Sequence, residues 1–222
     1  MARIEKSRLT KYEIVRVASK LFLEVGYSRT SPRMIAGELG ISTGNLTYHY
    51  PIKDHLLAVL VEMLCDFQWK LMEKEAGEGI SSIMAVCLEL MSMASACENN
   101  EIAKDLFISA YRSPLALEII RQNDVMRAKK VFAEYCPHWT DEQFAEAEIL
   151  VYGIEYATLM AAGDPVPLAT RITGALNQIL TIYNVPEEIR IRKTEKVLAM
   201  DYNTIGEKIL SEFIRYVETI NE

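Results

Sequence analysis

The sequence predicts an all-α protein in which a small group of three helices is followed by a larger helical body. Apolar residues recur at helical spacing along most of the chain, and alternating strand patterns of useful length are absent. Glycine and proline are sparse, with 10 and 7 among 222 residues, and several of them stand where a helix begins or ends. Half of the residues are apolar and a quarter are charged, which is the composition of a folded globular chain.

The first helix is marked by one apolar stripe. Its members are Ile14, Val17, Ala18, Leu21, Phe22 and Val25. Gly26 ends this helix, because glycine tolerates the conformation that follows a helical C-terminus. Ser31 and Pro32 then begin a short second helix, since serine caps a helix and proline suits its first position. That helix runs to Leu39, and Gly40 ends it.

Two more helices begin after this turn. Ser42 caps a third, short helix, and Pro51 begins a long helix that runs to about Glu75. From Gly79 onwards the helices become longer. Residues 80–98 are apolar almost all round, so we expect a helix that is buried on several sides.

The rest of the chain is divided into helices by caps and turns. Thr140 with Gln143 makes a capping box, and the stretch GDPVP at 163–167 makes a turn. The expected helices run from Ser113 to about Tyr135, from Thr140 to Ala162, over 168–183, onwards from Pro186, and through a last segment with Ile205, Ile209, Phe213 and Val217 on one face.

Charge is distributed unevenly along the chain. Residues 1–55 hold 9 Lys and Arg against 5 Asp and Glu, a net charge of +4, whereas the whole chain carries −7. The remaining residues therefore carry −11. A basic front attached to an acidic body indicates a front that meets phosphate groups and a body that does not.

The cysteines and the apolar runs indicate the compartment. Four cysteines, Cys65, Cys87, Cys97 and Cys136, form no C-x-x-C pair, and each lies in an apolar helical context. We therefore expect four buried thiols and a reducing environment. No apolar run approaches the roughly 20 residues needed to cross a bilayer, and no signal segment opens the chain. We expect a cytoplasmic protein without a membrane partner.

Residues 31–50 have the spacing of a helix-turn-helix. The side chains expected to face inwards are Ile35, Ala36, Leu39, Ile41 and Leu46. Ala36 must be small because the two helices cross there, and Gly40 can adopt the positive φ of the turn. The side chains expected to face outwards on the second helix are Thr43, Asn45, Thr47, Tyr48 and His49. Uncharged or weakly charged hydrogen-bonding groups of this kind suit the base edges and phosphates of a DNA major groove.

This front part resembles the tetracycline-repressor (TetR) family of bacterial transcriptional regulators. The stretches that carry the resemblance are IVRVASKLFLEVGY, MIAGELGIS and TGNLTYHYPIKDHL. Within them Ile35-Ala36, Leu39-Gly40, Gly44, Leu46, Tyr50, Lys53 and Leu56 fall where the family pattern expects them. The resemblance covers roughly residues 1–57, and the rest of the chain matches only in its general plan of several long helices.

The resemblance implies a set of DNA-contacting residues. Those implied to contact bases or the groove are Arg33, Thr43, Gly44, Asn45, Tyr48 and His49, and those implied to clamp phosphates are Ser31, Thr47, Tyr50 and Lys53. One position departs from the family, which commonly has a tyrosine where this chain has Thr47. Either the shorter hydroxyl weakens a phosphate contact or Tyr48 takes that contact over. Tyr50 has a second interpretation as a structural wedge against Phe22.

The body contains candidates for a ligand pocket. These are Glu89, Met93, Phe107, Tyr111, Tyr152, Glu155 and Tyr156. Methionine and aromatic side chains adapt well to small apolar ligands, and a carboxylate among apolar neighbours could recognise a cationic ligand. Core packing explains the aromatic residues and Met93 equally well, and a helix edge that reaches water explains the carboxylates.

Catalysis finds little support in the sequence. The three histidines, His49, His55 and His138, have no partner at metal-ligand spacing. No nucleophile elbow, phosphate loop or dinucleotide glycine motif is present. We expect no enzyme, no metal and no cofactor.

Together these patterns predict a DNA-binding domain over residues 1–55 and a regulatory, ligand-binding and dimerisation domain over residues 56–222. The expected function is that of a ligand-responsive homodimeric repressor that binds a roughly palindromic double-stranded DNA operator. We expect the dimer to form through residues 141–162 and 168–183, and the effector to be a small molecule. The alternative is a helical ligand-sensing or protein-interaction module whose helix-turn-helix does not read DNA.

Overall fold

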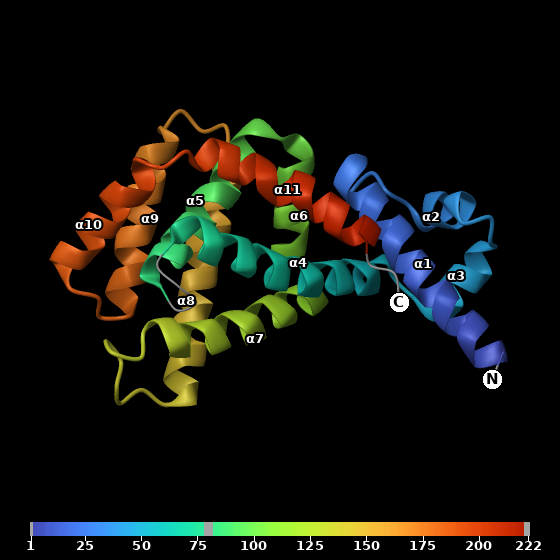
Figure 1. Cartoon of the computed structure of the whole chain (residues 1–222), viewed down its shortest axis with the longest axis horizontal. Coiled ribbons are helices and arrows are strands. Elements are labelled where there is room, and N and C mark those ends of the chain that lie inside the picture. The colour runs from blue at the N-terminus through green and yellow to red at the C-terminus, as the bar shows by residue number, and fades with distance from the viewer. Residues whose placement is uncertain (1, 78–81, 220–222) are drawn as a thin grey trace.

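The computed structural model describes residues 2–77 and 82–219, with side chains described from residue 11 to residue 218. Within these residues the chain forms eleven helices and no strand, which confirms the predicted fold class (Figure 1). Their bounds are α1 Ala2–Glu24, α2 Pro32–Glu38, α3 Thr43–His49, α4 Lys53–Ala76, α5 Ile83–Asn99, α6 Glu101–Arg112, α7 Pro114–Val131, α8 Asp141–Met160, α9 Leu168–Ile182, α10 Glu187–Leu198 and α11 Tyr202–Thr219.

The helices form an elongated molecule with a small head and a larger body. Helices α1, α2 and α3 make up the head, and α9 and α10 lie at the opposite end (Figure 1). Helix α4 leads from the head into the body, where it packs against α5 and α7. Helix α11 returns from the body and lies against α1, so two long helices connect the two parts.

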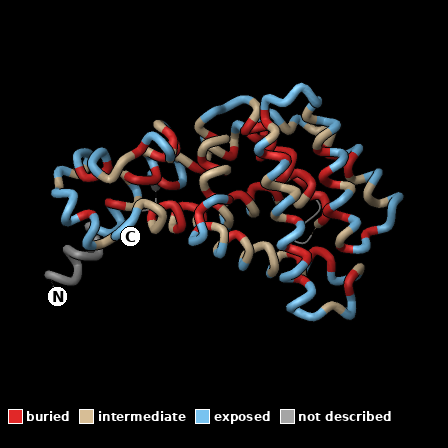
Figure 2. Tube along the Cα trace, turned by 180° about the vertical axis from the view of Figure 1, so that it is seen from behind, coloured by how far each residue is buried: buried red, intermediate tan, exposed pale blue. Residues whose placement is uncertain are grey.

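A single apolar core extends through both parts. Phe22, Ile35 and Leu46 from the head belong to the same contiguous cluster as Leu88 and Phe213 from the body. Buried residues accordingly run along the whole length of the trace (Figure 2). The head and the body therefore share one core.

Several predicted helix starts are confirmed by their capping bonds. The Ser31 hydroxyl accepts from the Met34 N–H at 3.3 Å, and the Ser42 hydroxyl accepts from the Asn45 N–H at 3.1 Å. The capping box of Thr140 is present at the start of α8. These caps are local in sequence, which is why their positions were predictable.

Three boundaries differ from those expected. Helix α4 begins at Lys53 and not at Pro51, because Ile52 is still extended and takes the N-cap position. Helix α7 ends at Val131 and not near Tyr135, since the chain turns at Phe132 to stack its ring on Tyr183, with the ring centroids 4.0 Å apart. The start of α6 was not expected at all, although the end of α5 agrees with the expected range of 80–98; Asn100 marks this start by capping α6 with its side-chain oxygen.

Helix α5 is buried on almost every side, as the sequence predicts. Helix α11 crosses it closely at Gly206, where a Cβ atom would stand 2.9 Å from the Ser92 carbonyl oxygen. Only glycine allows this approach.

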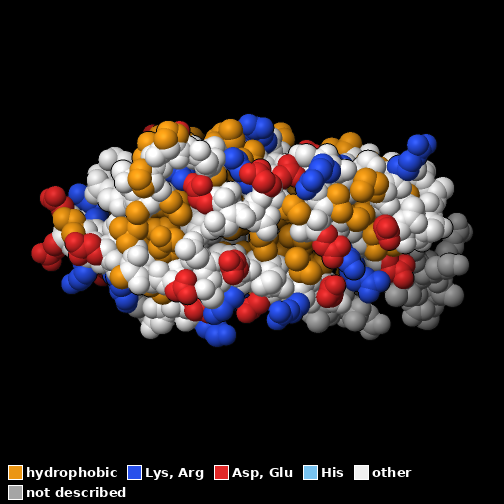
Figure 3. Space-filling model, turned by 90° about the horizontal axis from the view of Figure 1, so that it is seen from above, with side chains coloured by type: hydrophobic (Ala, Val, Ile, Leu, Met, Phe, Trp, Pro, Cys, Tyr) orange, Lys and Arg blue, Asp and Glu red, His pale blue; other side chains and the backbone are white. Residues whose placement is uncertain are grey.

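The four thiols are not equally buried. Cys87, Cys97 and Cys136 are buried, as expected, but Cys65 on α4, which lines a cavity of the body, is only partly buried. Among the described residues no helix is long and apolar enough to cross a membrane. The face seen from above carries interspersed acidic and basic side chains with apolar patches between them (Figure 3).

Candidate nucleic-acid interface and internal cavity

Helices α2 and α3 form the helix-turn-helix that the spacing predicts. Ile35, Ala36 and Leu46 are buried at the crossing of the two helices. Gly40 takes a φ of +63°, and the Ile41 N–H donates to the Ala36 carbonyl at 3.0 Å. The turn is therefore closed by the backbone and places α3 against α2 with one face outwards.

The outer face of α3 is polar and exposed. Thr43, Gly44, Asn45, Thr47 and Tyr48 all lie on the surface, and the Tyr48 side chain is 81% exposed. The Thr47 hydroxyl donates to the Gly44 carbonyl at 3.2 Å, so it is engaged within its own helix. The Tyr48 ring, by contrast, projects from the helix surface.

Arg33 is exposed on α2, but other implied DNA contacts are partly occupied within the protein. His49 is half-buried, its ring lies edge-on to Tyr48, and its buried Nδ1 has no hydrogen-bond partner in the described part of the chain. Ser31 serves as the cap of α2. Tyr50 packs against the core, while the ring edge-on to Phe22 is that of Tyr27, at 5.0 Å.

Lys53 contacts the head. Its Nζ donates to the carbonyl oxygens of Tyr27 and Thr30 at 2.8 and 3.0 Å, and lies 3.9 Å from the centre of the Tyr27 ring. Burial lowers the pKa of Lys53, against the opposing charges of Asp105 and Asp54. Lys53 thus holds the loop of residues 25–31 onto the start of α4.

The same loop is fastened by two carboxylates. Asp54 accepts from the Tyr27 hydroxyl and, at 3.0 Å, from the Ser113 hydroxyl. Asp105 on α6 accepts from the Ser28 N–H at 2.8 Å and from the Ser28 hydroxyl. We call these groups the junction network, consisting of Tyr27, Ser28, Lys53, Asp54, Asp105 and Ser113. Residues 28 and 105 lie too far apart in sequence for any local pattern to reveal their contact.

Most of the predicted ligand-pocket residues share one cavity inside the body. Glu89, Met93, Phe107, Tyr111 and Glu155 line a cavity of about 50 Å³. Its lining does not include Tyr152 and Tyr156. These two rings stack beside Tyr111, and the Tyr152 hydroxyl donates to the Tyr111 carbonyl at 3.1 Å.

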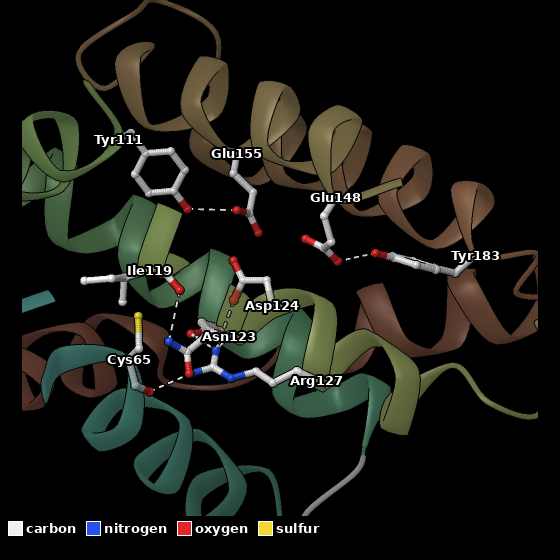
Figure 4. A network of polar contacts seen from close by, with 10 residues as sticks. Cys65, Tyr111, Ile119, Asn123, Asp124, Arg127, Glu148, Glu155 and Tyr183 are labelled. Atoms are coloured by element: carbon white, nitrogen blue, oxygen red, sulfur yellow. Dashed lines mark hydrogen bonds and ion pairs between the residues drawn. The ribbon is translucent and has the colours of Figure 1, made fainter. Parts of the chain in front are cut away.

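The cavity contains charged groups that sequence reasoning missed. Asp124 and Arg127 project from α7 towards it (Figure 4). The Arg127 guanidinium donates to both Glu89 oxygens at 3.1 and 3.3 Å and to the Cys65 carbonyl at 2.6 Å, and lies 3.5 Å from Asp124. A signal was present, because Asp124 and Arg127 stand three residues apart and thus share a helix face.

Two further carboxyls face the same region from α8. Glu155 accepts from the Tyr111 hydroxyl at 2.8 Å, and Glu148 accepts from the Tyr183 hydroxyl. Burial, with a lesser contribution from the charge of Glu148, raises the pKa of Glu155 to about 8. Burial also raises the pKa of Glu148 to about 7, although its Tyr183 hydrogen bond opposes this. We call Glu89, Asp124, Glu148 and Glu155 the acidic cluster.

A second cavity, of about 40 Å³, adjoins the first. Both are lined by Glu89, Asp124, Arg127 and Glu155, and the second also reaches Glu148. Within the described ranges no three His, Cys, Asp or Glu side chains are arranged to hold a metal ion.

The head is similar in sequence to a known protein family. Residues 14–60 match the sequence model of a family described as bacterial regulatory proteins, tetR family. This match confirms the resemblance seen in the sequence, and the matched segment contains both helices of the helix-turn-helix. No curated protein matches the chain.

Solved structures resemble the chain over most of its length. A gamma-butyrolactone receptor, an ArpA-like protein, is 18% identical, with 94% of this chain and 99% of that chain covered and a TM-score of 0.42. CprB, a TetR family protein from S. coelicolor A3(2), is 19% identical over 93% and 99% of the two chains, with a TM-score of 0.44. AmtR of Mycobacterium smegmatis is 21% identical over 84% and 93%, with a TM-score of 0.39.

Proposed function

We propose that the protein is a ligand-responsive, sequence-specific DNA-binding regulator that represses transcription as a cytoplasmic homodimer. The observation that carries the proposal is the exposed polar face of α3, which is supported from behind by the buried Leu46. Residues 1–55 would contact the operator, and residues 56–222 would bind the effector and the second subunit. The body would act by binding and not by catalysis.

The exposed side chains divide into two roles. Thr43, Asn45 and Tyr48 would contact base edges in the major groove, since their hydroxyl and amide groups can match base patterns. Arg33, which is exposed on α2, would contact bases or the groove beside them. We assign Lys53 a positioning role in addition, because its ammonium group already binds two carbonyls of the head.

The second subunit would pack on α8 and α9. Ile149 and Leu150 on α8 are 54% and 56% exposed, and Gly153 and Ala157 on the same helix are small and exposed. Exposed apolar and small side chains on one long helix suit close packing against another copy. A two-fold symmetric dimer would present its two copies of α3 to a roughly palindromic operator.

Effector binding would reach the head through α4 and α6. Helix α4 contributes Cys65 to the cavity and Lys53 to the junction network. Helix α6 contributes Tyr111 to the cavity and Asp105 to the junction network. A ligand that favours a shifted arrangement of these helices would change the separation of the two α3 helices, typically with a coupling of about 1–3 kcal/mol.

DNA binding can be tested with the full-length protein. Operator fragments selected from genomic DNA would be titrated at several salt concentrations, with random duplex for comparison. Asn45→Ala should relax specificity at one base pair, by about 1–3 kcal/mol, whereas Arg192→Ala on α10 at the far end of the molecule should have no effect. An equal loss on every sequence after Asn45→Ala contradicts the base-reading role.

The same titration tests the alternative. A protein-interaction module that does not read DNA would show neither selected fragments nor a dependence of affinity on salt concentration. That outcome would replace the proposed function with the alternative one.

Dimerisation can be tested by sedimentation. Ile149→Asp should convert the dimer to a monomer, because it places a charge in the proposed apolar interface. Ile191→Asp is a matched control, since Ile191 is 50% exposed on α10, outside that interface. Equal behaviour of the two variants would exclude α8 from the dimer contact.

A further inference from the structure

The two cavities and the charged groups between them form one region of the body. Glu89, Asp124, Arg127 and Glu155 line both cavities and separate them. The combined space is far smaller than a pocket for a drug-sized ligand, which is roughly 300–1,000 Å³. Any occupant of this region in its present shape is therefore a molecule of a few heavy atoms.

The region has too many acids for its one base. Among the described residues that line the two cavities, Arg127 is the only cation. Its guanidinium is committed to Glu89 and, less closely, to Asp124. Glu148 and Glu155 receive only tyrosine hydroxyl groups among the hydrogen bonds seen here. The raised pKa values of both are the expected result of burying a carboxyl without a counter-ion.

A second, independent feature points to a ligand. Gln68 on α4 is only 3% exposed and lines the larger cavity. Its amide Nε2 is buried and has no hydrogen-bond partner within the described chain. A buried donor without an acceptor is unfavourable, so an oxygen atom placed in the cavity would satisfy it.

Arg127 shows what chemistry the region accepts. Its guanidinium lies 4.6 Å from the centre of the Trp69 ring while it contacts Glu89. Carboxylate on one side and an aromatic face on another is the usual environment of a bound organic cation. The carboxyl of Asp124 lies between those of Glu155 and Glu148 (Figure 4), so carboxyl groups from α7 and α8 face one another there.

We infer that the region binds a small primary amine that carries a neutral acceptor oxygen, such as a short amino alcohol. The ammonium group would sit between Asp124 and Glu155, and the oxygen would accept from the Gln68 amide. As the effector of the regulator, and thus resting on the proposed function, the amine would compete with Arg127 for Asp124. It would thereby loosen the contact of Arg127 with the Cys65 carbonyl and release α4.

The test uses the full-length protein and four probes that share a three-carbon chain. Calorimetry would compare 3-aminopropan-1-ol with 1,3-propanediol, which lacks the charge, with 3-hydroxypropionate, which reverses it, and with propylamine, which lacks the oxygen. We expect 3-aminopropan-1-ol to bind with a Kd below about 10 mM and propylamine to bind about tenfold more weakly. The other two probes should not bind. Equal heats from all four, or none from 3-aminopropan-1-ol, would overturn the inference.

Proton release gives a second readout. Besides the acidic cluster and Arg127, the titratable groups that face the cavities are Cys65, Tyr111 and Tyr183. A bound ammonium favours ionised carboxylates, so the observed heat should change with the ionisation enthalpy of the buffer. A heat that is the same in all buffers at pH 7 contradicts binding at this cluster.

Variants locate the site. Glu155→Gln should weaken 3-aminopropan-1-ol binding at least tenfold, and Glu146→Gln, on the exposed side of the same helix, should not. Gln68→Leu should weaken binding of 3-aminopropan-1-ol but not of propylamine, which distinguishes a lost hydrogen bond from a damaged fold. Equal effects of Glu155→Gln and Glu146→Gln would place the amine elsewhere.

The outcome is separable from that of the proposed function. A protein that binds its selected DNA but none of the amines retains the function and loses the inference. A protein that binds 3-aminopropan-1-ol with the expected variant effects but no DNA retains the site and loses the function. Where both hold, the amine should weaken operator binding, and Glu155→Gln should abolish that response.

Discussion

The junction network and the acidic cluster are both polar, but they differ in how their charges are balanced. In the junction network each carboxylate accepts two donors, Asp54 from two hydroxyls and Asp105 from a backbone N–H and a hydroxyl, and Lys53 binds two carbonyls. In the acidic cluster, Arg127 is the only cation among the described residues that line the cavities, and it contacts Glu89 and Asp124, whereas Glu148 and Glu155 accept from tyrosine hydroxyls alone. One network is satisfied, whereas the other has an excess of like charge.

This difference assigns the two regions different tasks. A satisfied hydrogen-bond network fixes geometry, because any movement breaks several bonds at once. A buried group of like charges responds to protons and to cations, because either one removes the repulsion. The acidic cluster lies on α5, α7 and α8, and the junction network includes residues of α4 and α6. Because α5 and α7 pack against both α4 and α6, a change of charge in the body can reach the rigid connection at the head.

The largest effect is expected from removing Arg127, the cation of the acidic cluster. Arg127→Met should lower the free energy of unfolding by about 3–5 kcal/mol at pH 8, because it leaves buried carboxylates without their cation. The loss should be smaller at pH 5, because burial raises the pKa of Glu148 to about 7 and that of Glu155 to about 8, so both carboxyls are protonated there and no longer need the nearby positive charge. Urea unfolding at the two pH values measures this, and Lys130→Met, exposed on the same helix, is the control. A loss that does not depend on pH would show that packing, and not charge, is what Arg127 supplies.

Removing Lys53, the cation of the junction network, should have an effect that does not depend on pH. Lys53→Met should cost roughly 2 kcal/mol, the expected value for hydrogen bonds made by a charged group. The cost should be equal at pH 5.5 and pH 8, because the partners of Lys53 are backbone carbonyls, which do not titrate in this range. Lys20→Met on the exposed side of α1 is the matched control. Urea unfolding measures both variants. If the loss of unfolding free energy in Lys53→Met depends on pH as it does in Arg127→Met, the two networks do not differ in the way proposed.

The pH dependence of stability sharpens the comparison further. The pKa of Glu155 rises from 4.5 to about 8 on folding, so the folded protein keeps a proton that the unfolded chain releases. The stability that this proton supplies is complete below about pH 4.5 and is lost as the pH rises towards 8. Glu155→Gln should therefore stabilise the protein by roughly 1–2 kcal/mol at pH 8 and have little effect at pH 4.5. Thermal unfolding against pH tests this, and a constant difference from the wild-type protein contradicts it.

The parts of the structure that the sequence predicts are those that depend on neighbours along the chain. The caps at Ser31, Ser42 and Thr140 each involve a bond to a residue three positions away, and the turn at Gly40 needs only its own conformation. The apolar stripe of each helix likewise follows from its spacing. These features were sufficient to predict the helix-turn-helix and most helix bounds.

The contacts that join helices were not predictable in this way. Periodicity shows which face of a helix is inside but not which helix lies opposite, so the contact between Asp105 and Ser28 had no local signal. The two roles of Lys53 illustrate the same limit, because the family pattern indicates phosphate while the fold supplies two carbonyls. Glu89 and Glu155 stand out in the sequence as charges among apolar residues, and the spacing of Asp124 and Arg127 places these two on one helix face, but only the packing of α7 on α4 shows that Arg127 contacts Glu89 and Cys65.

The smallest expected effect concerns the outer edge of the junction network. Asp105→Asn should lower stability by at most about 1 kcal/mol, because the bonds of Asp105 to Ser28 lie near the surface. It should nevertheless weaken operator binding about threefold to tenfold, since the loop of residues 25–31 loses its anchor on α6 and the orientation of the head becomes less restricted. Fluorescence anisotropy with selected operator DNA measures the affinity, and Asp66→Asn, exposed on α4, is the control. If stability falls by several kcal/mol while affinity is unchanged, Asp105 supports the fold and does not orient the head, and the junction network loses the task that distinguishes it from the acidic cluster.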